Sequence, residues 1–239
     1  MHGAILVAGG SGRRMKNNVQ DKLLHPILHT NAFRLCCDAY LASKEISSLV
    51  IVYRDEVQKQ ALLAELNLAQ KHIIPTFSPI MIQGGKERKD SVLNGLLALP
   101  NECKFVQVHD CARPMIRSVT ISAITKEVEK KGAIVACRPM QDTVRECASR
   151  NTNANTPQST KTLDRNRLWL METPQAARKD WLVKALQEAN KREIFITDEI
   201  AALELLEKKT AFLQLEYPNP KITKADDLNL IEYLLQKND

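Results

Sequence analysis

Three short runs of glycine and charged residues in this 239-residue sequence have the types and spacing needed to bind phosphate groups. Residues 8–15 read AGGSGRRM, residues 84–91 read GGKERKDS, and residues 109–114 read HDCARP. Glycines let a backbone approach a ligand closely and turn its N–H groups toward phosphate oxygens. Arginines add positive charge and forked donors. We therefore expect a site that handles phosphorylated molecules.

The first run is a glycine-rich loop that follows a short apolar segment at 4–7, which is typical of a buried strand. It is not a P-loop, because Arg14 and Met15 stand where that pattern requires its second glycine. It is not a dinucleotide fingerprint either, because Met15 occupies the third glycine position counted from Gly10. We predict that the loop binds nucleotide phosphates and that Lys22 reaches back toward them. The alternative is a plain strand-to-helix turn with solvated arginines.

The third run places the carboxylate of Asp110 just after another strand candidate, 105–108. A carboxylate there suits magnesium, which usually takes one or two protein carboxylates together with phosphate oxygens. We therefore predict Asp110 as a metal ligand, with a structural ion pair to Arg113 as the alternative. His109 is interpreted as a packed, hydrogen-bonded histidine without a chemical role.

The second run follows a strand candidate at 80–82. Its double glycine can wrap a base or a ribose, and Ser91 offers a donor at the start of a helix that Asp90 is expected to cap. The alternative is a charged turn with a helix cap.

These runs must be positioned by an alternation of strands and helices along the chain. Apolar segments typical of strands alternate with segments of helical periodicity, which predicts an α/β fold with a mainly parallel sheet and helices on both faces. The expected strands are 4–7, 48–53, 80–82, 105–108 and 133–136; the expected helices are 31–43, 55–70, one from Asp90, 118–131, 181–190, 198–208 and 226–235. In such folds ligands bind beyond the carboxyl ends of the strands.

Residues 141–163 break this alternation, and their polar stretch at 151–160 predicts a loop or a projecting hairpin arm inserted into a single domain of 1–239. The net charge of +6 is compatible with nucleic acid or with phosphorylated metabolites, but aromatic residues make up only 5%, so no platform for stacking bases is expected. No apolar run approaches the roughly 20 residues that span a bilayer. The six cysteines show no metal-site spacing and are expected to be free. We expect a cytoplasmic protein that binds neither nucleic acid nor membrane.

The motifs together resemble those of the 2-C-methyl-D-erythritol 4-phosphate cytidylyltransferases, the CTP-using enzymes of the non-mevalonate isoprenoid pathway. The resemblance runs over nearly the whole chain. Besides the three runs and Lys22 it includes 142–143, 164–166, 173–175, 196–199 and 221–223. It implies a Rossmann-like fold of the nucleotide-diphospho-sugar transferase type.

The resemblance also implies roles for individual residues. Arg14 and Lys22 match the pair that stabilises the transition state, Arg165 and Lys221 match residues that position methylerythritol phosphate, and Thr143 matches an arm residue that reaches the substrate site of the partner subunit in a homodimer. Asp110 matches the metal-associated aspartate. We assign nucleotide binding to Ala8, Gly9, Gly10, Gly12, Gly85, Ser91 and Asp110, and substrate binding to Thr143, Arg113, Thr173 and Thr197.

The implied reaction is an in-line attack by the acceptor phosphate on the α-phosphorus of CTP, with magnesium as cofactor and pyrophosphate as the leaving group. Both reactants are anions, so the protein must mainly position and neutralise them. One alternative is a cytidylyltransferase for another polyol phosphate, such as ribitol 5-phosphate. Another is a non-catalytic nucleotide-sensing or nucleic-acid-binding protein, against which the presence of Arg14, Lys22 and Asp110 together argues.

Overall fold

The computed structural model describes residues 1–10, 21–70, 77–147 and 159–237. Seven strands form the central sheet in the order β11-β7-β10-β6-β1-β4-β5. Their bounds are β1 His2–Val7, β4 Ile46–Tyr53, β5 Ile80–Gln83, β6 Phe105–Asp110, β7 Ala133–Pro139, β10 Trp169–Arg178 and β11 Ala211–Gln214.

Six of these strands run in the same direction, which confirms the prediction of a mainly parallel sheet. β1 pairs in parallel with β4 and β6, β4 with β5, and β7 with β11. β10 is the reversed strand, because it pairs antiparallel with both β6 and β7. All five strand candidates of the sequence analysis are present, and β10 and β11 are additions to them.

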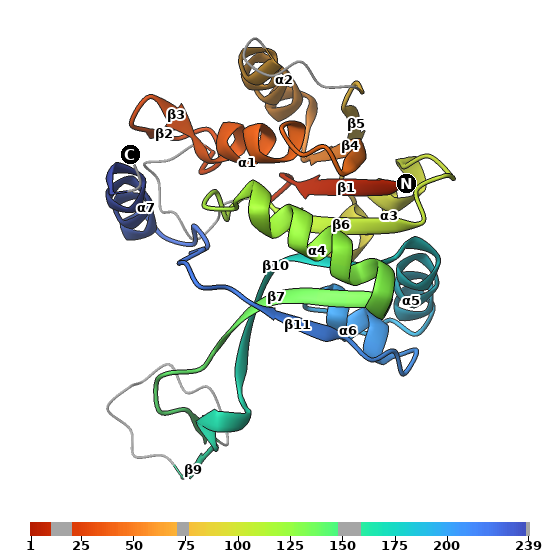
Figure 1. The fold of residues 1–239 in the computed structure, drawn as a ribbon, viewed down its shortest axis with the longest axis vertical. Helices are drawn as coiled ribbons and strands as arrows, with labels where there is room; N and C mark the ends of the chain where they lie inside the picture. The colour runs from red at the N-terminus through yellow and green to blue at the C-terminus, as the bar shows by residue number, and fades with distance from the viewer. Residues whose placement is uncertain (11–20, 71–76, 148–158, 238–239) are drawn as a thin grey trace.

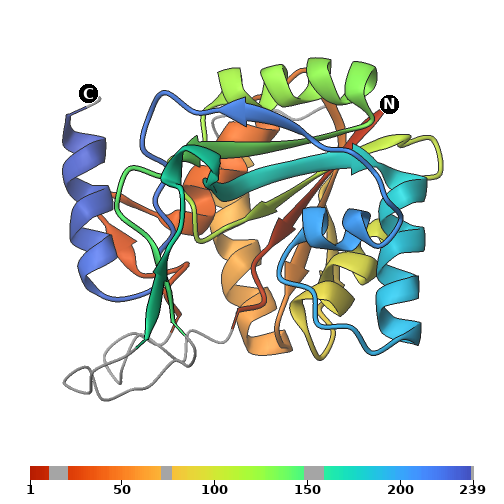
Figure 2. The same ribbon diagram turned by 90° about the horizontal axis from the view of Figure 1, so that it is seen from below.

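Helices cover both faces of the sheet (Figures 1 and 2). Along β1, Ala4 and Leu6 pack into one apolar core with α1, α2 and α7, whereas Ile5 between them packs into a second core with α3, α5 and α6. This follows from the alternation of side chains along a strand. The helices are α1 Ala32–Leu41, α2 Glu56–Gln70, α3 Arg88–Ala98, α4 Ser118–Lys131, α5 Lys179–Lys191, α6 Glu199–Glu204 and α7 Asp226–Gln236.

The start of α3 differs from the expectation. Glu87, not Asp90, is the N-cap residue, and Asp90 lies one turn inside the helix. Its side chain accepts a hydrogen bond from the Glu87 backbone N–H at 3.0 Å, as the acidic member of a capping box does. Arg88 is therefore the first residue of the helix, directly beside the turn that leaves β5.

The predicted arm projects from the body of the molecule at the lower left of Figure 1. It consists of the short antiparallel strands β8 Arg145–Cys147 and β9 Thr160–Thr162, followed by the 3₁₀ turn η2 Arg165–Arg167. Its root is formed where β7 and β10 extend beyond the sheet, with Trp169 opposite Pro139. A second small hairpin, β2 Pro26–Ile27 with β3 Thr30–Asn31, precedes α1.

All six cysteines are free, as expected, and five of them are buried while Cys147 on the arm is exposed. Burial raises the pKa of the Cys137 thiol to about 11, which makes it a weak nucleophile. Within the described ranges, none of the helices has the length and apolar character needed to cross a membrane.

Candidate active site

The second and third motif runs and the described start of the first, 8–10, lie at the carboxyl edge of the sheet, because β1, β5 and β6 run in the same direction and each is followed by one of them. A cavity of about 140 Å³ lies at this edge beside Asp110. The sequence motifs contribute these residues to its wall: Arg88, Asp110, Arg113, Thr173, Gln175, Thr197, Asp198 and Lys221.

A larger cavity of about 780 Å³ lies at the opposite edge, where Phe105 begins β6 and Arg178 ends β10. It contains none of the residues that the sequence assigns to chemistry. The smaller cavity is the candidate active site, because buried charged side chains converge on it and because ligands of such sheets bind at the carboxyl edge.

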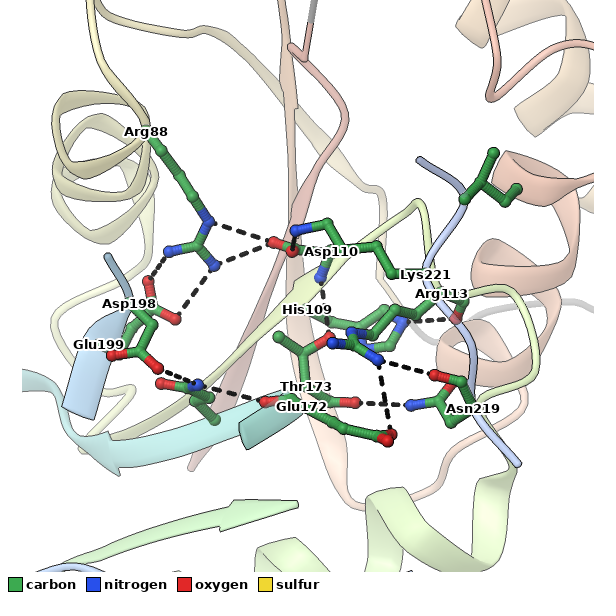
Figure 3. Close-up of polar contacts among 12 residues, drawn as sticks. Arg88, His109, Asp110, Arg113, Glu172, Thr173, Asp198, Glu199, Asn219 and Lys221 are labelled. Atoms are coloured by element: carbon green, nitrogen blue, oxygen red, sulfur yellow. Dashed lines mark hydrogen bonds and ion pairs between the residues drawn. The ribbon is translucent and has the colours of Figure 1, made fainter. Parts of the chain in front are cut away.

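Asp110 is the centre of this site (Figure 3). Its Oδ1 atom accepts hydrogen bonds from Nε and Nη2 of Arg88 at 3.2 and 2.9 Å, and its Oδ2 atom accepts one from Nζ of Lys221. Arg88 in turn donates from Nη1 and Nη2 to the two carboxylate oxygens of Glu199, at 2.6 and 3.1 Å. The ion pair between Asp110 and Arg113, left open by the sequence, is not the one that forms.

The electrostatics of this group follow from its burial. Burial alone raises the pKa of the Asp110 carboxyl, but Arg88 and Lys221 outweigh it and hold that pKa far below its ordinary value. Burial also raises the pKa of Glu199, while the charge of Arg88 acts against it. For Arg88, burial lowers the pKa, and the two carboxylates more than compensate. Asp110 and Arg88 are therefore charged at neutral pH.

Thr173 and His109 form a chain of hydrogen bonds that ends at the Asp110 backbone N–H. His109 Nε2 lies 3.1 Å from the Arg113 carbonyl oxygen, which can only accept, so this nitrogen carries the proton. The Thr173 hydroxyl then donates to His109 Nδ1 at 3.0 Å and accepts from the Asp110 backbone N–H at 3.2 Å. Burial lowers the pKa of His109 to about 4, so the ring is neutral. The interpretation of His109 as a packed histidine is confirmed.

Arg113 belongs to a second charged group in the same cavity. Its Nη1 donates to the Asn219 carbonyl oxygen at 2.7 Å and lies 3.6 Å from Oε2 of the buried Glu172. Arg138, at the root of the arm, donates to the other oxygen of Glu172. Asn219 donates to the Thr173 carbonyl oxygen at 3.0 Å and so ties the segment before Lys221 to β10.

Gln175 connects β10 to the start of α6. Its side chain donates to Asp198 at 2.9 Å and accepts from the Ile200 backbone N–H at 3.1 Å. Asp198 is also the N-cap of α6, since it accepts from the Ala201 backbone N–H at 2.9 Å. These contacts fix Glu199, which is the first residue of that helix.

Of the glycine-rich loop, only residues 8–10 are described. Ala8 is buried. Its backbone N–H donates to the Val52 carbonyl oxygen at 2.9 Å, and its carbonyl oxygen accepts a hydrogen bond from the Gln58 side chain at 3.0 Å. A Cβ atom on Gly9 would contact the Tyr53 backbone at 3.4 Å, whereas one on Gly10 would have no atom of the described residues within 4 Å. Gly12 and Arg14 lie outside the described residues.

Lys22 lies close to Lys221, although 199 positions separate them, because its Nζ donates to the Ile222 carbonyl oxygen at 2.7 Å. The neighbouring Asp21 turns away from it. Its carboxylate accepts from the Gln58 side chain at 2.6 Å and from Arg54 at 3.4 Å, and it caps the turn at Leu23. Asp21 thus joins this segment to α2 and pairs with Arg54 instead of with Lys22.

Gly85 and Ser91 form one compact turn. The Gly85 backbone N–H donates to Ser91 Oγ at 3.0 Å, and Ser91 donates to the Glu87 carbonyl oxygen at 3.1 Å. A Cβ atom on Gly85 would lie 2.3 Å from that of Asp90, so no side chain fits there. The turn therefore caps the helix and brings the backbone of Gly85 close to Asp90, and it positions Arg88 to contact Asp110.

The structure does not bring every predicted residue to this cavity. Thr197 lines it, but Thr143 and Arg165 lie exposed on the arm, where Arg165 donates to the Gln141 carbonyl oxygen at 2.8 Å. No role was predicted from the sequence for Arg88, Glu199 or Glu172. The first two lie inside quoted motifs, so the signal was present, whereas Glu172 is a buried charge in a strand that the apolar pattern does not reveal.

The comparisons with known proteins agree with this geometry. A family model described as "IspD: 2-C-methyl-D-erythritol 4-phosphate cytidylyltransferase" matches residues 2–237. A "Bifunctional enzyme IspD/IspF" from Desulfotalea psychrophila is 35% identical over 99% of this chain, which spans 57% of that protein. A "2-C-methyl-D-erythritol 4-phosphate cytidylyltransferase" from Desulforamulus reducens is 31% identical over 98% of this chain and 95% of its own length.

Solved structures show the same fold. The 4-diphosphocytidyl-2C-methyl-D-erythritol synthase of Anaerococcus prevotii has a TM-score of 0.80 at 22% identity and covers 99% of this chain and 96% of its own. The 2-C-methyl-D-erythritol 4-phosphate cytidylyltransferase of Thermus thermophilus has a TM-score of 0.73 at 20% identity, covering 99% and 100%. With the family match over nearly its full length, the chain belongs to the 2-C-methyl-D-erythritol 4-phosphate cytidylyltransferase family of nucleotidyltransferases.

Proposed function

We propose that this chain joins CTP and 2-C-methyl-D-erythritol 4-phosphate to give 4-diphosphocytidyl-2-C-methyl-D-erythritol and pyrophosphate, a step in isoprenoid precursor biosynthesis. One observation supports this most strongly. The start of the glycine-rich loop at 8–10, the Gly84–Ser91 turn and the Asp110–Lys221 pair come from separate parts of the chain and converge at one edge of the sheet. The family membership names the substrates that such a site would join.

The proposed step is a single in-line displacement. An oxygen of the acceptor phosphate forms a bond to the α-phosphorus of CTP, and the bond from that phosphorus to the bridging oxygen of pyrophosphate breaks. The electron pair leaves with pyrophosphate, so the atoms and charges balance without a covalent intermediate on the protein. A phosphate monoester carries about −1.5 to −2 charges near neutrality, so the protein has to offset the repulsion between the reactants.

Lys221, which lines the cavity, and the nearby Lys22 are suited to this task. Lys22 and Lys221 lie on neighbouring segments and are both partly exposed, so phosphate oxygens can reach them. In the proposal Lys22 offsets charge on the triphosphate together with Arg14, and Lys221 holds the phosphate of the acceptor. Ala8, Gly9, Gly10, Gly12, Gly85 and Ser91 would bind the nucleotide, and Arg113, Thr173 and Thr197 would shape the pocket.

Asp110 is suited to a magnesium ion. Oδ1 already accepts two hydrogen bonds from Arg88, whereas Oδ2 contacts Lys221 alone among the described side chains, which leaves one lone pair for a cation. No group of three or more His, Cys, Asp or Glu in the described ranges is arranged to bind a metal by itself. A single available carboxylate oxygen, that of Asp110, fits a magnesium ion held by one carboxylate and the triphosphate. When bound, magnesium would neutralise charge on the triphosphate oxygens.

We further propose that the protein is a cytoplasmic homodimer in which the arm completes the partner's site. Thr143 and Arg165 are exposed on the arm and do not line the cavity of their own subunit. Their proposed contact with methylerythritol phosphate would therefore be made across a dimer interface. Light scattering of the purified chain tests the oligomeric state.

The experiment that tests the function is pyrophosphate release from CTP with a panel of polyol phosphates in the presence of magnesium. We expect release with methylerythritol phosphate and little with ribitol 5-phosphate, and we expect EDTA to abolish it. Preferential use of ribitol 5-phosphate, or CTP binding without pyrophosphate release, would contradict the proposal.

A further inference from the structure

We propose that Arg88 is a positioning residue that remains bound to Asp110 as its counter-ion and thereby leaves Lys221 able to exchange Asp110 for the phosphate of the acceptor. The inference rests on the proposed function and adds a residue to it. Two roles compete for Lys221 in this site. Lys221 is assigned to the acceptor phosphate, yet its Nζ is already held by the Asp110 carboxylate.

The two cations share the Asp110 carboxylate unequally. Arg88 makes two charge-assisted hydrogen bonds to Oδ1, one from Nε and one from Nη2. Lys221 makes a single contact to Oδ2, and its side chain is 36% exposed compared with 27% for Arg88. Lysine is a point charge on a flexible stem, so it can change partners at lower cost than arginine. Lys221 is therefore the cation positioned to exchange.

Glu199 prevents Arg88 from exchanging in the same way. Its side chain is 2% exposed and accepts two hydrogen bonds from the guanidinium, so Arg88 has a carboxylate on each side (Figure 3). Glu199 is itself fixed at the start of α6 by the Asp198 cap and by Gln175. A phosphate that drew Arg88 away would leave the buried Glu199 without the one cation that the described residues place on it, and Asp110 with Lys221 alone. Stranding a buried carboxylate in this way carries a large desolvation penalty.

The same penalty explains why Lys221 needs Arg88. With Arg88 in place, Asp110 keeps a cation when Lys221 turns to the acceptor. Without Arg88, Lys221 is the one remaining side-chain cation that the described structure places on Asp110. If Lys221 then left, the buried carboxylate would depend on the proposed magnesium ion alone, so its exchange would become more costly. Loss of Arg88 should therefore trap Lys221 on Asp110 and weaken the use of the acceptor, not the binding of CTP.

The test measures both Michaelis constants in Arg88→Gln. We expect the KM for methylerythritol phosphate to rise by about tenfold or more, which is the size of effect expected when a charge-assisted hydrogen bond is lost. The KM for CTP should stay within about twofold, because Arg88 is proposed to act on the acceptor through Lys221 and not to contact the nucleotide. Arg88→Lys keeps the charge and should recover part of the loss.

Two further variants separate positioning from folding. Arg88→Gln leaves Glu199 buried without its partner, so the double variant Arg88→Gln/Glu199→Gln removes that cost and should show the same rise in acceptor KM as the single one. The matched control is Arg34→Gln, which breaks a half-buried Arg–Glu pair of similar geometry between α1 and α2. It should lower the melting temperature without changing the ratio of the two KM values.

Three outcomes would overturn the inference. A rise in the KM for CTP alone would mean that Arg88 contacts the nucleotide. Equal effects in Arg88→Gln and Arg34→Gln, in step with melting temperature, would mean a purely structural role. If the unchanged chain released no pyrophosphate with any polyol phosphate, the proposed function itself would fail and the inference with it. The first two outcomes leave the wild-type activity intact, so the two failures are distinguishable.

Discussion

Buried charges determine the chemistry of single residues in this protein. Asp110, Glu172 and Glu199 are almost completely inaccessible to solvent, and each is paired with at least one arginine. A buried carboxylate without a cation is costly, so these pairs hold one another in place. The site is therefore not a cluster of free positive charges, because most of the described cations around the cavity already have an anionic partner. Lys221, which lines the cavity, and the nearby Lys22 are the groups best suited to meet substrate.

The first prediction concerns Lys22. Lys22→Met keeps the aliphatic stem and removes the charge, and turnover should fall by about 10²-fold, the size of effect seen when one preorganised charge donor is lost. Steady-state pyrophosphate release measures this. Lys59→Met, which removes a lysine paired with Glu56 on α2, is the control and should keep wild-type turnover. Near wild-type turnover in Lys22→Met would refute its role.

The second prediction concerns the pH dependence of stability through His109. Burial lowers its pKa from 6.5 to about 4, so between these values the unfolded chain binds more protons than the folded one. The contribution is complete above pH 6.5 and is lost as the pH falls toward 4. Between pH 7 and pH 5 it should amount to about 2 kcal/mol of unfolding free energy.

Urea unfolding in EDTA at both pH values, compared with His109→Gln, measures this contribution. The wild type should lose more stability than the variant on going from pH 7 to pH 5. Equal losses in the two proteins would show that His109 titrates normally and is not a buried neutral ring.

The sequence predicted residues better than it predicted their partners. The types and spacing of 8–15, 84–91 and 109–114 predicted a phosphate site that includes Asp110, Gly85 and Ser91, and the structure places Asp110 in the cavity wall. The partner of Asp110 could not be read from the chain, because Arg88 and Lys221 are 22 and 111 positions away and meet it only through the sheet order. The nearby Arg113 was a reasonable alternative, but Glu172 takes it instead.

At the level of elements, the turn from β5 into α3 connects backbone geometry to the site. Gly84 donates to the Tyr53 carbonyl oxygen at 2.7 Å, Gly85 packs against Asp90, and the helix then begins with Arg88. The direction of Arg88 toward Asp110 therefore depends on how tightly this turn closes.

The third prediction uses two glycines with different surroundings. Gly85→Ala should destabilise the protein by about 1–3 kcal/mol, because the new Cβ would lie 2.3 Å from that of Asp90 and the turn has to open. Gly10→Ala should leave stability unchanged, since its Cβ would have no atom of the described part of the chain within 4 Å. Chemical unfolding of both variants measures the difference. Equal stabilities would mean that the turn is loose and does not position Arg88.

Strands and helices with a clear apolar period were predictable to within a few residues, as for α4, whose bounds 118–131 match. β10 was not predictable in this way. Its middle carries Glu172, Thr173 and Gln175, which are buried because the site and not the apolar core surrounds them. These polar residues hide the strand pattern. The reversed strand, which supplies four of the ten residues that line the cavity, was therefore visible only as a matched motif.

For the whole molecule, the sheet gathers the site at one edge while the arm carries two assigned residues away from it. Thr143 and Arg165 belong to the arm, and Lys221 belongs to the cavity. If the arm serves the partner subunit, each active site combines Lys221 from one chain with Arg165 from the other.

The fourth prediction tests this sharing. Arg165→Ala and Lys221→Ala should each be nearly inactive, but a mixed population of subunits should recover about a quarter of wild-type activity, because half of the dimers are mixed and each holds one intact site. The two variants are unfolded together, refolded and assayed. No recovery, with mixed dimers verified by mass spectrometry, would place Arg165 in the site of its own subunit.

The central claim is that CTP binds with its triphosphate at the carboxyl edge of the sheet, among Asp110, Lys22 and the glycine-rich loop. A crystal structure of the protein with CTP and magnesium tests this most directly. The account predicts the α-phosphate beside Asp110 and Lys22, with Lys221 facing the open side where the acceptor enters. A triphosphate bound elsewhere, for example in the larger cavity between Phe105 and Arg178, would contradict it.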